Sequence, residues 1–388
     1  MARRSHVWPA QRGFTLIELM ISLVISTLVV ILILSIFGRV SFAFREQQHV
    51  VNVQKVLAAA REAFDHDAKL AGLKLSQGFT LAADFTAGSN VRRPPVRVIN
   101  NTTTPDEVGF YYADLDYQAL VVGPSWTPAA PAPTRLQVTV DRNPGFVAND
   151  LVVMSTPTEV ASIIDPTNDA KVIEYAACVL QIDSVAGTVI TFKQNGNYGR
   201  AGNDHCQSPP VQSSTYLYKF VAHYWRIDRT TAARQAMGAL QLDLTGALLG
   251  VVNTNFQDQA YGVVDLQVAT YYYDGNGTDT ADPDTDGNRD WYSSEQQETN
   301  TNSIAVASSF LQPLVMSFSL VARTNATVEG IYTANSPALT VTSNTTNNTV
   351  GDRASVTLPS ATDSALMGFR IYRYITFQVD LRNTGVGR

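Results

Sequence analysis

The feature that most constrains this chain is an apolar stretch near its N-terminus. Residues 19–38 carry no charged side chain, and their only polar side chains are Ser22, Ser26, Thr27 and Ser35. An α-helix of about 20 residues is about 30 Å long, which matches the hydrocarbon core of a bilayer. The hydroxyls can bond to carbonyls of the helix itself, so they do not keep the stretch out of lipid. It predicts one membrane-spanning helix.

The charges before this stretch predict its orientation. Arg3, Arg4 and Arg12 precede it, and the first 13 residues contain no acidic side chain. Basic residues tend to remain on the cytoplasmic side of a membrane. We therefore expect a cytoplasmic N-terminus and an extracytoplasmic location for the part of the chain that follows residue 38.

Three kinds of N-terminal segment fit an apolar stretch: a cleaved secretory signal, a plain anchor, or a more specialised one. Ser41 and Ala43 offer a small-residue pair for signal cleavage, but a signal core has only about 7–15 apolar residues. A plain anchor does not account for Glu18, which lies within the run GFTLIELM. An ionised carboxylate costs about 2.5–3.5 kcal/mol at the bilayer centre and less near the edge. Such a group usually has a partner.

The string Arg12–Glu18, RGFTLIE, resembles the cleavage and methylation motif of type IV prepilins. The resemblance implies a membrane peptidase that cuts after Gly13 on the cytoplasmic side and methylates the new N-terminal residue, Phe14. It also implies a partner for Glu18, because in this family the corresponding glutamate faces the α-amino group of a neighbouring subunit. That ion pair sets the register between subunits.

Beyond the membrane stretch, the helix is predicted to continue with an apolar stripe. The stripe follows spacings of three and four residues, and no Gly or Pro occurs in residues 39–71. A coiled coil or a β-domain could cover such a stripe. Because only about three heptads are present and the following sequence is strand-like, we favour the β-domain. The stripe consists of Val50, Val53, Leu57, Ala60, Phe64, Ala68 and Ala71.

The remainder of the chain reads as short β segments separated by turns. A Pro/Ala loop at residues 124–133 and a Thr/Asn/Ser-rich insertion at residues 324–357 interrupt them. Gly72 and residues 76–78 are predicted to close the helix. The expected strands are 96–99, 107–112, 136–140, 151–154, 172–182, 189–192, 216–227, 263–273, 314–321 and 371–381.

These patterns predict an α+β fold, in which one long helix packs on a large, antiparallel, β-rich globular domain. The first half of the helix spans the membrane and the second half is amphipathic. The expected organisation is a leader peptide at 1–13, a transmembrane helix at 14–38, its amphipathic continuation at 39–72 and an extracytoplasmic β-rich domain at 73–388.

Four further strings resemble the PilW type of minor pilin: DAKLAG at 67–72, GVVDLQV at 262–268, LVAR at 320–323 and YRYITFQVDLRN at 372–383. The resemblance implies a minor pilin that primes assembly at the tip of a type IV pilus. Its partners would be the prepilin peptidase, other minor pilins, the major pilin and the assembly machinery of the inner membrane. A type II secretion pseudopilin and a tip adhesin or binding module are the alternatives.

The two cysteines, Cys178 and Cys206, lie in the part of the chain expected outside the cytoplasm, where thiols are oxidised. A disulfide between them would close a loop of about 29 residues and stabilise the domain by about 3–4 kcal/mol. Two unpaired thiols, with Cys178 buried in a strand, are the alternative.

An acidic loop between two expected strands suggests a calcium site. Asp282, Asp284 and Asp286 alternate and precede Gly287, as in calcium loops of the D-x-D-x-D-G type, and Asp290 occupies the ninth position. Position twelve is Ser293 rather than Glu, so the loop is not an EF-hand. The alternative is a solvated turn rich in Asp and Asn. Ca²⁺ is the one cofactor that the sequence suggests.

Composition and motifs argue against two other classes of protein. The net charge is −6 with 28 Lys and Arg that form no cluster, so no direct binding of nucleic acid is expected. No H-E-x-x-H, G-x-S-x-G, G-x-G-x-x-G or C-x-x-C motif occurs, which indicates a protein that is not an enzyme. A nucleophile pair of Cys206 and His223 is conceivable, but we expect His223 to be a structural residue.

Overall fold

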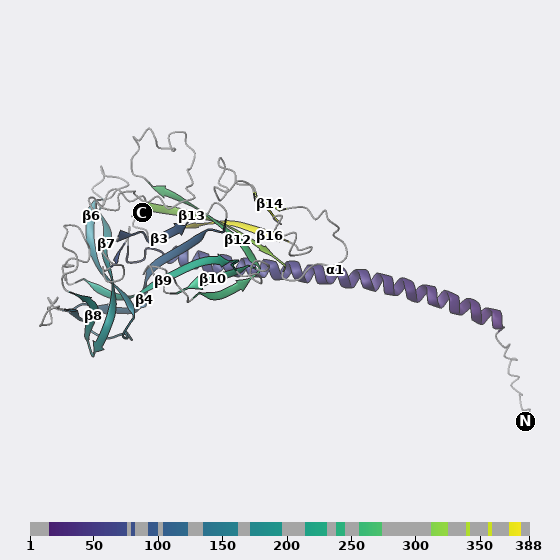
Figure 1. Cartoon of the computed structure of the whole chain (residues 1–388), viewed down its shortest axis with the longest axis horizontal. Coiled ribbons are helices and arrows are strands. Elements are labelled where there is room, and N and C mark those ends of the chain that lie inside the picture. The colour runs from purple at the N-terminus through teal and green to yellow at the C-terminus, as the bar shows by residue number, and fades with distance from the viewer. Residues whose placement is uncertain are drawn as a thin grey trace, which may run out of the picture. The chain divides into compact units, whose positions relative to one another are not determined.

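The computed structural model describes residues 15–75, 79–81, 92–99, 104–122, 135–161, 171–195, 214–230, 238–244, 256–273, 312–324, 339–341, 356–358 and 372–381 (Figure 1). The chain divides into two compact units, Met1–Asn52 and Val53–Arg388. In the described part of the chain, a helix, α1 (Leu16–Leu70), precedes all the strands. The α+β class is therefore confirmed.

The strands cover most of the described residues after α1. They are β1 (Phe79–Leu81), β2 (Arg92–Arg93), β3 (Val96–Ile99), β4 (Glu107–Leu120), β5 (Arg135–Thr139), β6 (Leu151–Ala161), β7 (Lys171–Ala186), β8 (Val189–Asn195), β9 (Tyr216–Asp228), β10 (Ala239–Asp243), β11 (Gln257–Tyr261), β12 (Val263–Tyr273), β13 (Gln312–Arg323), β14 (Leu339–Val341), β15 (Val356–Leu358) and β16 (Tyr372–Asp380).

Helix α1 ends where the sequence predicts. Gly72 has a φ of 81°, the left-handed conformation that favours glycine after the last helical turn. The chain then runs along strand β4, because Gly72 N donates to Tyr111 O at 2.9 Å and Ala113 N donates to Leu73 O at 3.1 Å. The helix end is thereby joined directly to the edge of a sheet.

The strands form two larger sheets and one pair. The largest sheet has eleven strands, with the order β11-β10-β9-β6-β7-β1-β2 and with β3, β4, β5 and β8 attached beside that path. Strand β9 pairs with β4, β6 and β10. A second sheet has the order β12-β13-β16, and β14 pairs with β15. The described pairings are antiparallel except for the short contact of β1 with β7.

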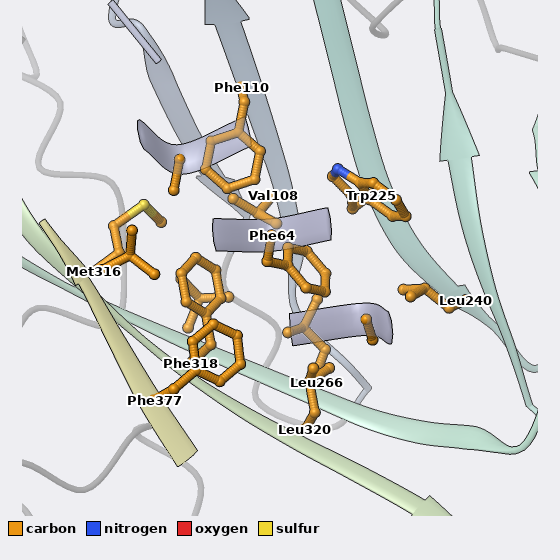
Figure 2. Close-up of a cluster of buried hydrophobic side chains, with 14 of the residues drawn as sticks. Phe64, Val108, Phe110, Trp225, Leu240, Leu266, Met316, Phe318, Leu320 and Phe377 are labelled. Carbon is orange, nitrogen blue, oxygen red and sulfur yellow. The ribbon is translucent and has the colours of Figure 1, made fainter. Parts of the chain in front are cut away.

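In the second unit, the stripe of α1 lies in a core that both larger sheets share. Val53, Leu57, Ala60, Phe64 and Ala68 are all buried. Figure 2 shows Phe64 among Phe110 and Trp225 of the large sheet and Phe318 and Phe377 of the second sheet. The Phe64 ring centroid is 5.1 Å from that of Trp225 and 5.3 Å from that of Phe318. A β-domain rather than a coiled coil therefore covers the stripe.

Each of the ten expected strands overlaps an observed one, and residues 96–99 and 263–273 match their strands fully. Six short strands were not expected, namely β1, β2, β10, β11, β14 and β15. The sequence of β11, QDQAY, has no apolar alternation because the strand is at the end of the described order of its sheet and is largely exposed. Strand β10 is buried at all five positions, including the polar residues Gln241 and Asp243. Its polar residues therefore do not mark an exposed face, as they would in a half-buried strand.

Candidate functional site: the N-terminal end of the long helix

Helix α1 begins with three reciprocal hydrogen bonds between Thr15 and Glu18. The Thr15 backbone N–H donates to Glu18 Oε2 at 3.0 Å, and the Thr15 hydroxyl donates to the same oxygen at 2.9 Å. In return, the Glu18 backbone N–H donates to Thr15 Oγ1 at 3.3 Å. This arrangement is a capping box, which satisfies N–H groups that a helix start leaves unpaired. It accounts for the start of the described helix at Leu16, with Thr15 as the N-cap residue.

The capping box leaves part of the Glu18 carboxylate available. Both bonds from Thr15 end on Oε2, and no described residue bonds Oε1, whose lone pairs suit a donor from another molecule. The neighbouring side chains are apolar and exposed: Leu16 is 79% and Ile17 is 66% exposed. The carboxylate thus stands on a surface that otherwise suits hydrocarbon or another apolar helix. A charged donor brought to such a surface would be bound more strongly than in water.

The apolar half of α1 is long and apolar enough to cross a membrane, judged by length and composition. Three of its hydroxyls bond within the helix: Ser22 to Leu19 O at 2.9 Å, Thr27 to Leu23 O at 2.7 Å and Ser35 to Leu32 O at 2.8 Å. These side chains therefore add little cost in lipid. Large apolar side chains from Leu16 to Phe37 are exposed.

Several predicted site residues lie outside the described residues. Gly13 and Phe14 precede them, and the acidic residues Asp282, Asp284, Asp286 and Asp290 and the cysteine Cys206 fall in gaps between described segments. Cys178 is described and lies on β7, 1% exposed within an apolar cluster. Because Cys206 lies outside the described residues, the disulfide between Cys178 and Cys206 stays a prediction. In the described segments, no group of three or more His, Cys, Asp or Glu residues is arranged to hold a metal ion, and the acidic loop is not among those segments.

One polar residue that we did not predict as a site stands out at the other end of α1. Asp67 is 3% exposed, and its carboxylate is bonded to side chains of β4 and β9. The sequence indicates that Asp67 is buried, because Asp67 follows Phe64 by three residues and precedes Ala71 by four, which is the spacing of the buried stripe. An acidic residue at such a position predicts a buried carboxylate with partners.

Comparison with known proteins identifies the N-terminal segment. Residues 8–37 match the family described as the prokaryotic N-terminal methylation motif. No curated protein and no solved structure matches the chain. The motif indicates a type IV pilin-like or pseudopilin-like protein, and it implies processing by a prepilin peptidase and assembly with pilus components. It is typical of structural subunits rather than enzymes. Together with the apolar helix, it fits anchoring in a membrane.

Proposed function

We propose that this protein is a minor pilin of a type IV pilus, cleaved after Gly13, methylated on the new N-terminal residue Phe14 and assembled near the fibre tip. The observation that carries the proposal is the motif RGFTLIE followed directly by a capped, exposed, apolar helix. Until assembly, the helix holds the protein in the inner membrane with its N-terminus in the cytoplasm. The β-domain then lies in the periplasm and later at the cell surface.

Assembly on this proposal depends on Glu18. Cleavage after Gly13 creates an α-amino group on Phe14, which an uncut chain lacks. Oε1 of Glu18, which makes no hydrogen bond within the described part of the chain, would accept a charge-assisted hydrogen bond from the protonated amino group of a neighbouring subunit. Because the surrounding surface is apolar, a misplaced carboxylate has no other strong partner, so this pair specifies register.

Two observations support the PilW type: the length of the chain, and the positions of the strings that resemble PilW-type minor pilins. Residues 262–268 lead into and lie on β12, residues 320–323 lie on β13, and residues 372–380 form β16. These three strands make up the second sheet, so three of the four resembling strings share one structural unit, and the fourth, at 67–72, lies at the end of α1. The strings and the sheet are the basis for proposing a minor pilin rather than a shorter major pilin.

Glu18→Ala and Glu18→Gln test the role of the carboxylate in assembly. We expect both variants to be cut after Gly13 and both to yield few or no surface pili, measured by shear preparation and immunoblotting. Glu62→Gln, a substitution of the same chemistry on the second half of the helix, is the control and should assemble. Normal piliation of the Glu18 variants would contradict the proposal. So would an N-terminal mass without methylated Phe14 in cells that contain the peptidase.

The motif fits a type II secretion pseudopilin equally well. Deletion of the protein separates the two functions when pili, twitching motility and protein secretion are scored in the same strain. Loss of pili and twitching with normal secretion supports the minor pilin, and the reverse supports the pseudopilin.

Calcium binding and the disulfide remain proposals on the same domain. Ca²⁺ would be held by Asp282, Asp284, Asp286 and Asp290, where it could rigidify a surface used by a tip-binding module. Calorimetry with Ca²⁺ before and after chelation tests it, and neither heat nor a thermal shift would be seen if the loop is only a solvated turn. A mass shift on alkylation with and without reductant tests the pairing of Cys178 with Cys206.

A further inference from the structure

The carboxylate of Asp67 lies in an unfavourable place for a negative charge. Asp67 occupies the last turn of α1, close to the negative end of the helix dipole. Its side chain is only 4% exposed. A buried carboxylate without donors is strongly destabilising, so its presence requires specific partners.

Three side chains of the large sheet supply these partners. The Trp225 indole N–H donates to Asp67 Oδ2 at 2.8 Å. His223 Nδ1 lies 2.9 Å from Oδ1 and 3.0 Å from Oδ2, and the Tyr112 hydroxyl donates to Oδ1 at 3.3 Å. An ionised carboxylate only accepts hydrogen bonds, so His223 must carry its proton on Nδ1 in this arrangement. Burial raises the pKa of Tyr112, and the charge of Asp67 raises it further, so that hydroxyl remains a donor.

The three partners come from two paired strands. Tyr112 lies on β4, and His223 and Trp225 lie on β9, whose residues are bonded to β4 along most of its length. The bonds join positions at least 45 residues apart in the sequence. They therefore report tertiary placement of the helix and not local helix structure.

The apolar stripe alone specifies the position of the helix less sharply. Several of its members are alanines, namely Ala60, Ala68 and Ala71, and small apolar side chains tolerate small rotations and shifts. Only one rotation about the helix axis presents Asp67 to all three donors. Trp225 joins the two kinds of contact, because its ring packs against Phe64 while its N–H binds Asp67.

We propose that Asp67, Tyr112, His223 and Trp225 form a polar latch that holds the last turns of α1 in one rotational setting on the sheet. Opening of the latch releases the end of the helix while the β-sheets remain folded. This role is separate from the proposed minor-pilin function, since it concerns the attachment of the helix to its own domain and requires no partner subunit.

Hydrogen–deuterium exchange on the full chain in detergent micelles tests the latch. Asp67→Asn places an amide N–H₂ against donors that need an acceptor, so we expect exchange in residues 64–75 to become at least about tenfold faster. Asp65→Asn is the matched control, because the Asp65 side chain is partly exposed and its ion pair among the described residues is with Lys69 on the same helix. Unchanged exchange in Asp67→Asn, or an equal rise over all the strands, would overturn the proposal.

Substitutions of His223 test the chemistry of the latch. His223→Asn retains an N–H donor near the position of Nδ1 and should leave exchange in residues 64–75 within about threefold of the wild type, whereas His223→Leu should resemble Asp67→Asn. His66, whose Nδ1 is 3.4 Å from Asp67 but whose side chain is 66% exposed, provides the control His66→Leu with little effect. Equal behaviour of His223→Asn and His223→Leu would contradict a role for the hydrogen bond.

A double substitution separates the latch from general packing. Trp225→Phe keeps an aromatic ring against Phe64 and removes the N–H that binds Asp67. If Asp67→Asn yields no folded protein, Trp225→Phe alone tests the latch by the same exchange measurement. In the combination with Asp67→Asn, the increase in exchange should be smaller than the product of the two single increases, because both remove the same bond. If the increase in exchange in the double variant equals the product of the two single increases, Asp67 and Trp225 act independently, which contradicts the latch.

Discussion

The two halves of α1 use apolar side chains for different surroundings. Side chains from Leu16 to Phe37 are exposed around the whole helix, whereas in Val53–Ala68 the apolar residues form one stripe that the sheets bury. The first half therefore suits contact with lipid or with other helices on any side, and the second suits one fixed surface. One continuous helix thus carries an apolar surface exposed on all sides in its first half and a single buried apolar stripe in its second half.

The two halves also handle a carboxylate differently. Glu18 is bonded by Thr15, three residues away, and within the described residues its second oxygen carries no bond. Asp67 is bonded by residues of two distant strands and is almost fully buried. A carboxylate that is bonded only by a nearby residue, like that of Glu18, can still contact another molecule. A carboxylate that is bonded by distant strands, like that of Asp67, instead helps to hold the domain together.

Replacement of one aromatic residue in each half should give the largest contrast. Phe64→Ala removes a fully buried ring from the shared core and should lower the free energy of unfolding by about 3–5 kcal/mol. Phe37 is 70% exposed, so Phe37→Ala should change it by less than about 0.5 kcal/mol. Denaturant unfolding in micelles, followed by tryptophan fluorescence, measures both. Similar losses would contradict the division of the helix into two surfaces.

Alkaline pH should destabilise the second half and its domain. Burial raises the pKa of Tyr112 and Tyr224, and bonds to Asp67 and Glu107 add to the effect. Unfolded tyrosines ionise near pH 10, so above about pH 10 the folded state binds more protons than the unfolded one. Stability is then full below about pH 10 and falls as pH rises, by at most about 1.4 kcal/mol per pH unit for each tyrosine.

Tyr112→Phe and Tyr224→Phe sharpen this expectation. Each should reduce the steepness of the alkaline loss, measured by denaturant unfolding at several pH values from 8 to about 11.5. Identical slopes in the wild type and both variants would show that these hydroxyls do not cause the loss.

The smallest expected effect concerns the capping box. Thr15→Ala removes an N-cap oxygen and one donor to Glu18, which should destabilise the first turn of α1 by about 1 kcal/mol. Amide exchange of residues 17–19 in micelles should accelerate, with no change in residues 64–75. Thr27→Ala is the control, since that hydroxyl bonds a carbonyl inside the helix. A response at residues 64–75 would show that the two ends are coupled.

The elements that could be predicted from the sequence depend on local periodicity. The stripe through Phe64, the helix end at Gly72 and strand 263–273 all follow from spacing or turn chemistry among neighbouring residues. The Thr15 and Glu18 bonds also follow a local pattern, although the sequence motif predicts only an intermolecular role for Glu18. The buried stripe was correct except at Val50, which is partly exposed.

What could not be predicted depends on contacts between distant segments. Strand order is not encoded in local spacing, so the division into an eleven-stranded sheet and a separate β12-β13-β16 sheet was not foreseen. The same holds for Asp67, whose donors on β4 and β9 become neighbours only after the sheet forms. Strand β11 was missed because its exposed polar residues lack the alternation of a half-buried strand.

The core around Phe64 has a consequence for the order in which the protein matures. Its members extend from Val53 near the start of the chain to Leu381 near residue 388, and Phe377 of β16 stacks on Phe318 with ring centroids 5.2 Å apart. Contacts that are so distant in sequence make folding slow. If the part of the chain after the membrane helix is exported in sequence order, the amphipathic stretch of α1 emerges early, and its cover is complete only when β16 has emerged. During that interval its apolar stripe is a binding site for chaperones or for other unfinished chains.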